Sequence, residues 1–172
     1  TLEDNGPRIG EFEFRRKYGL LDKRVLFVPL QRPNDSVIRF LSGNVSGVDH
    51  FCEEISKLSR SLGPEWRIIL KQHPLETVTP AIPGVTVLST DTHVYDAISA
   101  ADAIALINSG VGLLGLCFGK PVFCFGKAFY AHPGLAETVT DAEDLHRKLT
   151  HIHPPNKEVV LRFIHYLTNE FY

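Results

Sequence analysis

Residues 103–112, with the sequence AIALINSGVG, indicate the fold class of this chain most directly. Its first five residues are apolar throughout, as a strand must be when helices cover both faces of a parallel sheet. Two small polar residues and two glycines then lead into a second apolar segment, which is typical of a tight turn from a strand into a helix. The stretch therefore predicts a buried strand at residues 103–107.

Four further apolar runs have the same character and predict four more strands. They cover residues 25–28, 66–70, 85–88 and 122–125. Amphipathic segments separate the runs, and such an alternation of strands and helices indicates a parallel sheet. The predicted fold class is α/β, with a Rossmann-like sheet of five parallel strands and helices on both faces.

The crossover helices have recognisable start and stop signals. Residues 48–62 keep the apolar spacing of a helix, with Ser46 available as its cap and Gly63-Pro64 as its stop. Thr92 is predicted to cap a shorter helix, and residues 110–118 form the next crossover.

Two helices are expected at the end of the chain. Thr140 and Glu143 form a capping-box pair for residues 141–149. Asn156 is expected to cap the last helix, whose apolar residues fall on one face.

Composition and charge describe a soluble globular domain. The chain has 172 residues, 44% of them hydrophobic and 22% charged, which suffices for a core without disulfides or metal. A net charge of −2 offers no positive field for nucleic acid. No apolar stretch approaches the roughly 18 residues of a membrane span, so a cytoplasmic location is expected. Cys52, Cys117 and Cys124 lie in apolar runs and are interpreted as reduced core residues, so no metal site is predicted.

The expected domain organisation has two parts. Residues 1–23 are interpreted as an N-terminal segment or interdomain linker, and residues 24–172 as a Rossmann-like domain that ends in two helices. The sequence contains no methionine, which suggests a piece of a longer protein.

Candidate site residues follow the strands, because ligands of open α/β sheets bind at the carboxyl ends of the strands. The loop after the first strand contains Gln31, Asp35 and Ser36 among many groups that donate or accept hydrogen bonds. An ordinary surface turn is the alternative interpretation of this loop. Lys71 and His73 follow the second strand in the same way.

His73 is singled out by its position. The dipeptide His-Pro occurs three times, but only His73-Pro74 directly follows a predicted strand. An imidazole there, beside Lys71, is suited to donate a hydrogen bond to a phosphate and help it leave. The alternative is a loop histidine without a catalytic role.

The turn after the strand at residues 103–107 predicts an anion site. Asn108, Ser109, Gly110 and Gly112 lead into a helix, whose backbone N–H groups and dipole favour a phosphate when no side chain intervenes. Alternatively, the glycines only permit close packing. The same residues begin the pattern Gly-x-Gly-x-x-Gly, but the next strand lacks the acidic residue of a dinucleotide site, so NAD binding is a minor alternative.

The loop after the strand at residues 122–125 contains Phe129 and Tyr130 among basic and glycine residues. Such a loop is suited to wall a sugar or base pocket, and plain loop packing is the alternative.

Taken together, these motifs resemble the bacterial capsule Kdo transferases. The resemblance rests on Val-Pro-Leu-Gln with Asp-Ser, then Lys-Gln-His-Pro, Asn-Ser with glycines, Gly-Lys-Pro-Val, and Phe-Tyr with Pro-Gly-Leu, in this order over residues 25–135. It implies one domain, the C-terminal half, of a GT-B glycosyltransferase that binds a CMP-activated sugar.

The resemblance also implies roles for individual residues. Gln31, Asp35 and Ser36 would border the donor site, His73 and Ser109 with the Gly110 amide would contact the phosphate, and Tyr130 would line the pocket. The CMP-sugar is a substrate, so no cofactor is implied.

A glycolipid or oligosaccharide acceptor would bind through an N-terminal domain that this chain does not contain, together with the catalytic carboxylate. Such an acceptor is compatible with peripheral association at the inner membrane. Three alternatives stay open: a CDP-glycerol transferase, a UDP-GlcNAc 2-epimerase-like enzyme, and a non-catalytic interaction domain of the same fold.

Overall fold

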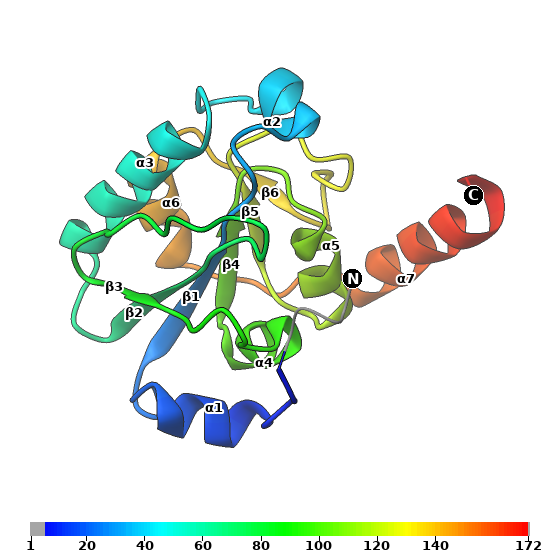
Figure 1. Cartoon of the computed structure of the whole chain (residues 1–172). Helices are drawn as coiled ribbons and strands as arrows, with labels where there is room; N and C mark the ends of the chain where they lie inside the picture. The colour runs from blue at the N-terminus through cyan, green and yellow to red at the C-terminus, as the bar shows by residue number, and fades with distance from the viewer. Residues whose placement is uncertain (1–5, 172) are drawn as a thin grey trace.

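Six parallel strands form a single sheet in the computed structural model, which describes residues 6–171 (Figure 1). The strand order is β3-β2-β1-β4-β5-β6. The strands are β1 Arg24–Pro29, β2 Trp66–Lys71, β3 Val85–Val87, β4 Ala103–Leu106, β5 Val122–Cys124 and β6 Glu137–Thr138. The predicted α/β class and the five predicted strands are confirmed, and β6 was missed because both of its residues are polar and exposed.

The chain reverses its direction across the sheet between β1 and β4. Strands β1 to β3 progress toward one edge, whereas β4 to β6 progress toward the other. This is the order of the doubly wound dinucleotide-binding folds, in which the carboxyl ends of the two strands at the reversal open a crevice for ligands. The site is therefore expected beyond Pro29 and Leu106.

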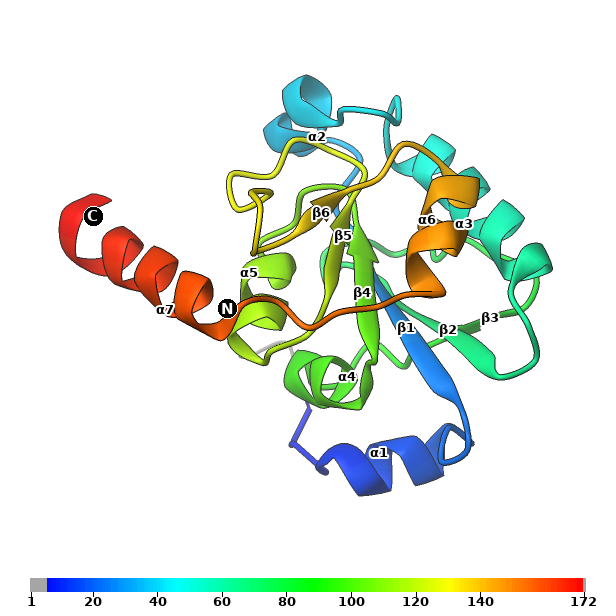
Figure 2. The same ribbon diagram turned by 180° about the vertical axis from the view of Figure 1, so that it is seen from behind.

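Helices cover both faces of the sheet, as the apolar strands require. The helices are α1 Glu11–Lys17, α2 Ser36–Leu41, α3 Val48–Ser61, α4 Val94–Ala100, α5 Val111–Cys117, α6 Ala142–Leu149 and α7 Lys157–Tyr166, followed by a π-helical turn, Leu167–Phe171. Leu26 and Val28 of β1 pack in a cluster with residues of α3 and α6. Val25 and Phe27 pack in a second cluster with residues of α1, α4, α5 and α7. Figure 2 shows these two groups of helices on opposite sides of the sheet.

The predicted N-terminal segment or linker contains a helix that is tied to the sheet domain. The Arg15 guanidinium donates to the carbonyl of Ala100 (2.6 Å) and forms an ion pair with Asp102 (3.0 Å). The buried carboxylate of Asp96 accepts hydrogen bonds from the backbone N–H groups of Ile9 (2.8 Å) and Gly10 (3.2 Å). These contacts fix α1 against α4.

The predicted helix starts are correct to within one or two residues. Asn156 caps α7 as expected, accepting from Glu158 and Val159. The cap of α3 is Gly47 instead of Ser46. The cap of α4 is His93, whose Nδ1 accepts from Tyr95 N, instead of Thr92, whose hydroxyl pairs with Tyr18.

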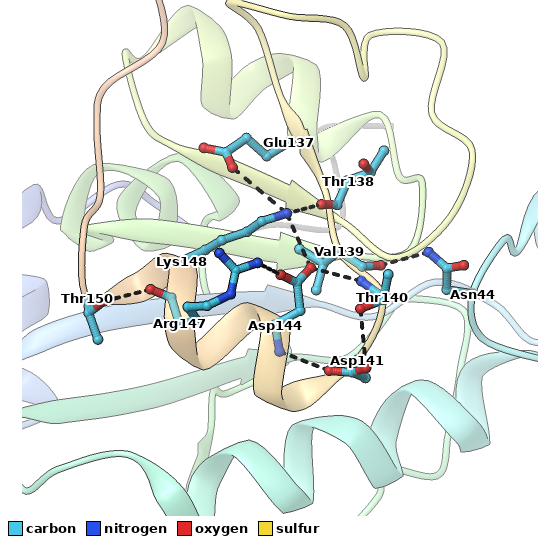
Figure 3. Close-up of polar contacts among 10 residues, drawn as sticks. All are labelled: Asn44, Glu137, Thr138, Val139, Thr140, Asp141, Asp144, Arg147, Lys148 and Thr150. Atoms are coloured by element: carbon cyan, nitrogen blue, oxygen red, sulfur yellow. Dashed lines mark hydrogen bonds and ion pairs between the residues drawn. The ribbon is translucent and has the colours of Figure 1, made fainter.

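The cap of α6 is Asp141, so the predicted pair of Thr140 and Glu143 is wrong. Asp141 accepts from Asp144 N (2.9 Å), and Asp144 in turn accepts from Thr140 N (3.2 Å), as Figure 3 shows. In the same cluster, Lys148 contacts Asp144 (3.2 Å) and donates to the carbonyl of Thr138 in β6. The polar face of α6 thus fixes the short edge strand that the sequence pattern did not reveal.

Candidate functional site

A cavity of about 420 Å³ lies at the carboxyl ends of β1, β2 and β4. It adjoins the point where the strand order reverses, which is where ligands bind in this kind of sheet. Its wall contains most of the predicted site residues, contributed by three separate loops: Gln31, Asp35, Lys71, His73, Asn108, Ser109 and Gly110. The structure therefore brings these predicted residues together around one cavity.

Two hydrogen bonds join Gln31 and Asn108 across the point where the strand order reverses between β1 and β4. Gln31 Nε2 donates to Asn108 Oδ1 (3.0 Å), and Asn108 N donates to Gln31 Oε1 (3.1 Å). The Asn108 carboxamide also donates to the carbonyls of Val37 (3.2 Å) and Leu41 (2.8 Å) in α2. Because these contacts occupy the Asn108 side chain, its contribution to the site is the shape of the wall.

Helix α2 borders the cavity, although the sequence predicted only a loop there. Asp35 caps this helix, because its Oδ1 accepts from Val37 N (3.0 Å). Ser36 is the first residue of α2, is exposed and lies outside the cavity wall. The structure thus brings Asp35 to the site but not Ser36.

Lys71 places a buried positive charge in the cavity wall. Its side chain is 6% exposed, and Nζ donates to the carbonyl of Thr90 (2.9 Å). Burial lowers the pKa of this ammonium group, and the negative charge of Asp91 opposes that effect. An ammonium has three donors, so this group can hold an anion while it keeps its bond to Thr90.

His73 lies half-buried at the start of a tight turn. Leu75 N donates to His73 Nδ1 (3.2 Å), and Glu76 N donates to the His73 carbonyl (2.9 Å). Because Nδ1 is an acceptor, the proton of the neutral ring resides on Nε2. An ion pair between Arg32 and Glu76 (3.0 Å) joins this turn to the loop after β1.

Ser109 and Gly110 lie between β4 and α5, and Gly110 is the N-cap of α5. Ser109 Oγ accepts from Val111 N (3.2 Å), and the Ser109 carbonyl accepts from Gly112 N (3.0 Å). Within residues 6–171, the N–H groups of Ser109 and Gly110 have no hydrogen-bond partner. A Cβ added at Gly110 would meet no atom within 4 Å. This turn therefore exposes backbone donors with no side chain in front of them.

Gly112 and Tyr130 lie behind this turn and do not line the cavity, which corrects the expected position of both. Tyr130 is fully buried and donates to the Ser109 carbonyl. Burial raises the pKa of its phenol, which therefore remains a donor. A Cβ at Gly112 would lie 2.2 Å from the Tyr130 hydroxyl, and one at Gly115 would lie 2.5 Å from Ile104. Close packing, the alternative interpretation, explains these two glycines.

A paired substitution tests this distinction. We expect Gly112→Ala to destabilise the fold by about 1–3 kcal/mol, because a methyl group there overlaps the buried Tyr130 ring. Gly110→Ala should change the unfolding free energy by less than about 1 kcal/mol, since its methyl group points into open space. Chemical denaturation of both variants measures the difference. Equal stabilities would show that the Tyr130 side chain does not exclude a methyl group at position 112.

Gln72 and Val94 also line the cavity and were not predicted as site residues. The position of Gln72, directly after β2, was a usable signal. Nothing in the sequence pattern pointed to Val94, which reaches the cavity from the start of α4.

Two surface hollows are larger than this cavity but do not resemble a site. One of about 610 Å³ lies over α6, where Asp141, Asp144 and Arg147 already pair with one another (Figure 3). Another of about 670 Å³ lies between α2 and α3. Neither hollow lies at the strand reversal.

Among the described residues, no helix is long and apolar enough to cross a membrane.

Comparisons with known proteins agree with this geometry. A family model described as "Capsule polysaccharide biosynthesis protein" matches residues 15–172. The capsule polysaccharide modification protein LipB of Neisseria meningitidis serogroup A is 27% identical, over 83% of this chain and 36% of LipB. The chain therefore spans about a third of the length of this curated relative.

Solved structures show the same fold. KpsC of Thermosulfurimonas dismutans, a beta Kdo 2,7 transferase, superposes with a TM-score of 0.57 at 28% identity, over 82% of this chain and 50% of that one. The wall teichoic acid polymerase TagF gives a TM-score of 0.60 at 16% identity, over 91% of this chain and 42% of that one. At that identity TagF supports the fold alone.

Proposed function

Because the chain belongs to the family of capsule polysaccharide biosynthesis proteins, we propose that it is the donor-binding domain of a glycosyltransferase that uses a CMP-activated sugar, CMP-Kdo. The observation that carries this proposal is the buried Lys71 ammonium, which shares one cavity wall with the Ser109–Gly110 turn. The likeness to a Kdo transferase at 28% identity supports the choice of sugar. The cavity volume falls within the range of about 300–1,000 Å³ for small-molecule sites.

The residues of the cavity suit the departure of a phosphate. In the proposed reaction an acceptor hydroxyl attacks the anomeric carbon, the bond from that carbon to the phosphate oxygen breaks, and CMP leaves. Lys71 and the amides of Ser109 and Gly110 stabilise the negative charge, and His73 donates a hydrogen bond to the phosphate from Nε2. The acceptor binds to a second domain, as in a GT-B enzyme, and that domain also supplies the base that removes the proton of the acceptor hydroxyl.

The first test is a comparison of nucleotides by thermal shift. We expect CMP to raise the melting temperature more than UMP, UDP, GMP or NAD. At one hundred times its Kd, a ligand stabilises a fold by about 2.7 kcal/mol, which is readily measured. EDTA should not change the result, because the strand-end loops lack the clustered carboxylates that hold Mg²⁺. A larger shift with UDP or NAD would disprove the CMP-sugar proposal.

A further inference from the structure

Gln72 carries a buried polar atom that the fold leaves unused. Its Nε2 donates to the carbonyl of Val78 (2.9 Å), which fixes the orientation of the carboxamide. Its Oε1 is buried and has no hydrogen-bond partner among the residues that the structure describes. The Gln72 residue is 7% exposed and forms part of the cavity wall.

An unpaired buried acceptor destabilises a protein, so its presence at a cavity needs an explanation. One other buried side-chain atom in the described part of the chain lacks a hydrogen bond, Arg15 Nε, and it lies at α1, away from the cavity. Gln72 Oε1 is thus distinguished by its place. A neutral acceptor binds an N–H or O–H group and disfavours a second acceptor or an anion.

The neighbours of Gln72 determine which part of a ligand it can contact. Lys71 and His73, on either side in the sequence, are donors suited to a phosphate, whereas Gln72 offers a carbonyl oxygen. The uncharged part of a nucleotide carries the complementary donors. Cytosine has an amino group where uracil has a carbonyl, and the ribose has hydroxyl groups.

Protein atoms cover Gln72 Oε1, and the adjoining loop exposes apolar side chains instead of burying them. Leu75 and Val78 of this loop are 64% and 79% exposed. A segment with so few buried apolar contacts opens at low cost. Contact between a ligand and the oxygen therefore requires a shift of this loop.

We infer that Gln72 is a specificity-determining residue that accepts a hydrogen bond from a donor group on the nucleotide, the cytosine amine or a ribose hydroxyl. This inference rests on the proposed function, since it assumes that the cavity binds CMP. It adds the residue that distinguishes CMP from UMP, through the amine, or from 2′-deoxyCMP, through the 2′-hydroxyl.

The test compares three nucleotides on the parent chain and on Gln72→Met. Isothermal titration calorimetry gives the Kd of CMP, UMP and 2′-deoxyCMP. If Gln72 contacts the amine, the preference for CMP over UMP should fall by about 3- to 10-fold in the variant, the effect of one lost hydrogen bond. If Gln72 contacts the 2′-hydroxyl, the preference for CMP over 2′-deoxyCMP should fall by that factor instead.

Two further variants distinguish nucleotide selection by Gln72 from its anchoring of the loop through Val78. Gln72→Glu keeps an acceptor oxygen but loses the amide donor to Val78, so it should retain the preference of the parent. Gln31→Met removes a glutamine of the same wall whose two polar groups are both paired with Asn108, so it should weaken all three nucleotides by a similar factor.

Equal weakening of all three nucleotides by Gln72→Met would overturn the inference and leave Gln72 as a loop anchor. A parent chain that binds none of them would instead reject the proposed function. The two failures are therefore distinguishable.

Discussion

His73→Ala is expected to lower kcat for sugar transfer by about 10²- to 10³-fold in the two-domain enzyme that we propose, the usual cost of removing one hydrogen-bond donor to a developing negative charge. Negative charge on the departing phosphate is greater in the transition state than in the bound donor. An interaction that grows with this charge lowers the barrier more than it strengthens binding. The KM for the donor should therefore change much less than kcat.

The chain offers a matched control for this experiment. His153-Pro154 repeats the His73-Pro74 dipeptide in an exposed segment outside the cavity, so His153→Ala should leave kcat unchanged. Melting temperatures check that the His73 variant is folded, since it loses the acceptor for Leu75 N. An unchanged kcat for His73→Ala, or an equal loss for both variants, would remove His73 from the mechanism.

The strands were predictable because burial on both faces leaves a direct mark on the sequence. Residues 103–107 are apolar at every position, and Arg67 and Thr86 are the exceptions in the four similar runs, because helices cover both faces of a parallel sheet. Strand β6 leaves no such mark. Its two residues, Glu137 and Thr138, are exposed, and Lys148 of α6 fixes it through a carbonyl contact that no residue pattern encodes.

The place of the site followed from topology, whereas the role of each residue did not. Parallel strands bring their carboxyl ends to one edge, so Lys71, His73 and Gly110 had to lie near one another. Side-chain partners are decided in three dimensions. Gln31 and Asn108 are 77 residues apart, and nothing local to either shows that each satisfies the other.

Tyr130 illustrates the same limit for aromatic residues. A tyrosine in a loop after a strand is suited either to line a pocket or to pack beneath it. Tyr130 is fully buried and donates to the Ser109 carbonyl, so it packs beneath the cavity. The closeness of Gly112 to the phenol, which agrees with packing, is seen only in the structure.

Lys71→Met is expected to weaken CMP binding by about 10- to 150-fold, because a hydrogen bond between charged groups contributes about 1.5–3 kcal/mol. Methionine has a similar length and is apolar, so the buried part of the side chain should be replaced with little strain. Removing a buried ammonium from the cavity wall should cost the fold little stability, since burial already disfavours the charged form. The affinity should therefore fall much more than the melting temperature.

The pH dependence of CMP binding is a second test of the role of Lys71. Burial lowers the pKa of Lys71, and a bound phosphate raises it again by stabilising the ammonium. CMP affinity should therefore be full at neutral pH and decline as the pH rises through the lowered pKa, below the ordinary lysine value of about 10.4. The Lys71→Met variant should lose that decline. Lys120→Met is the matched control, because Lys120 also donates to a carbonyl, that of Ser99 (2.8 Å), but lies outside the cavity wall. CMP affinity that is equal for Lys71→Met and Lys120→Met would show that the phosphate does not bind at Lys71.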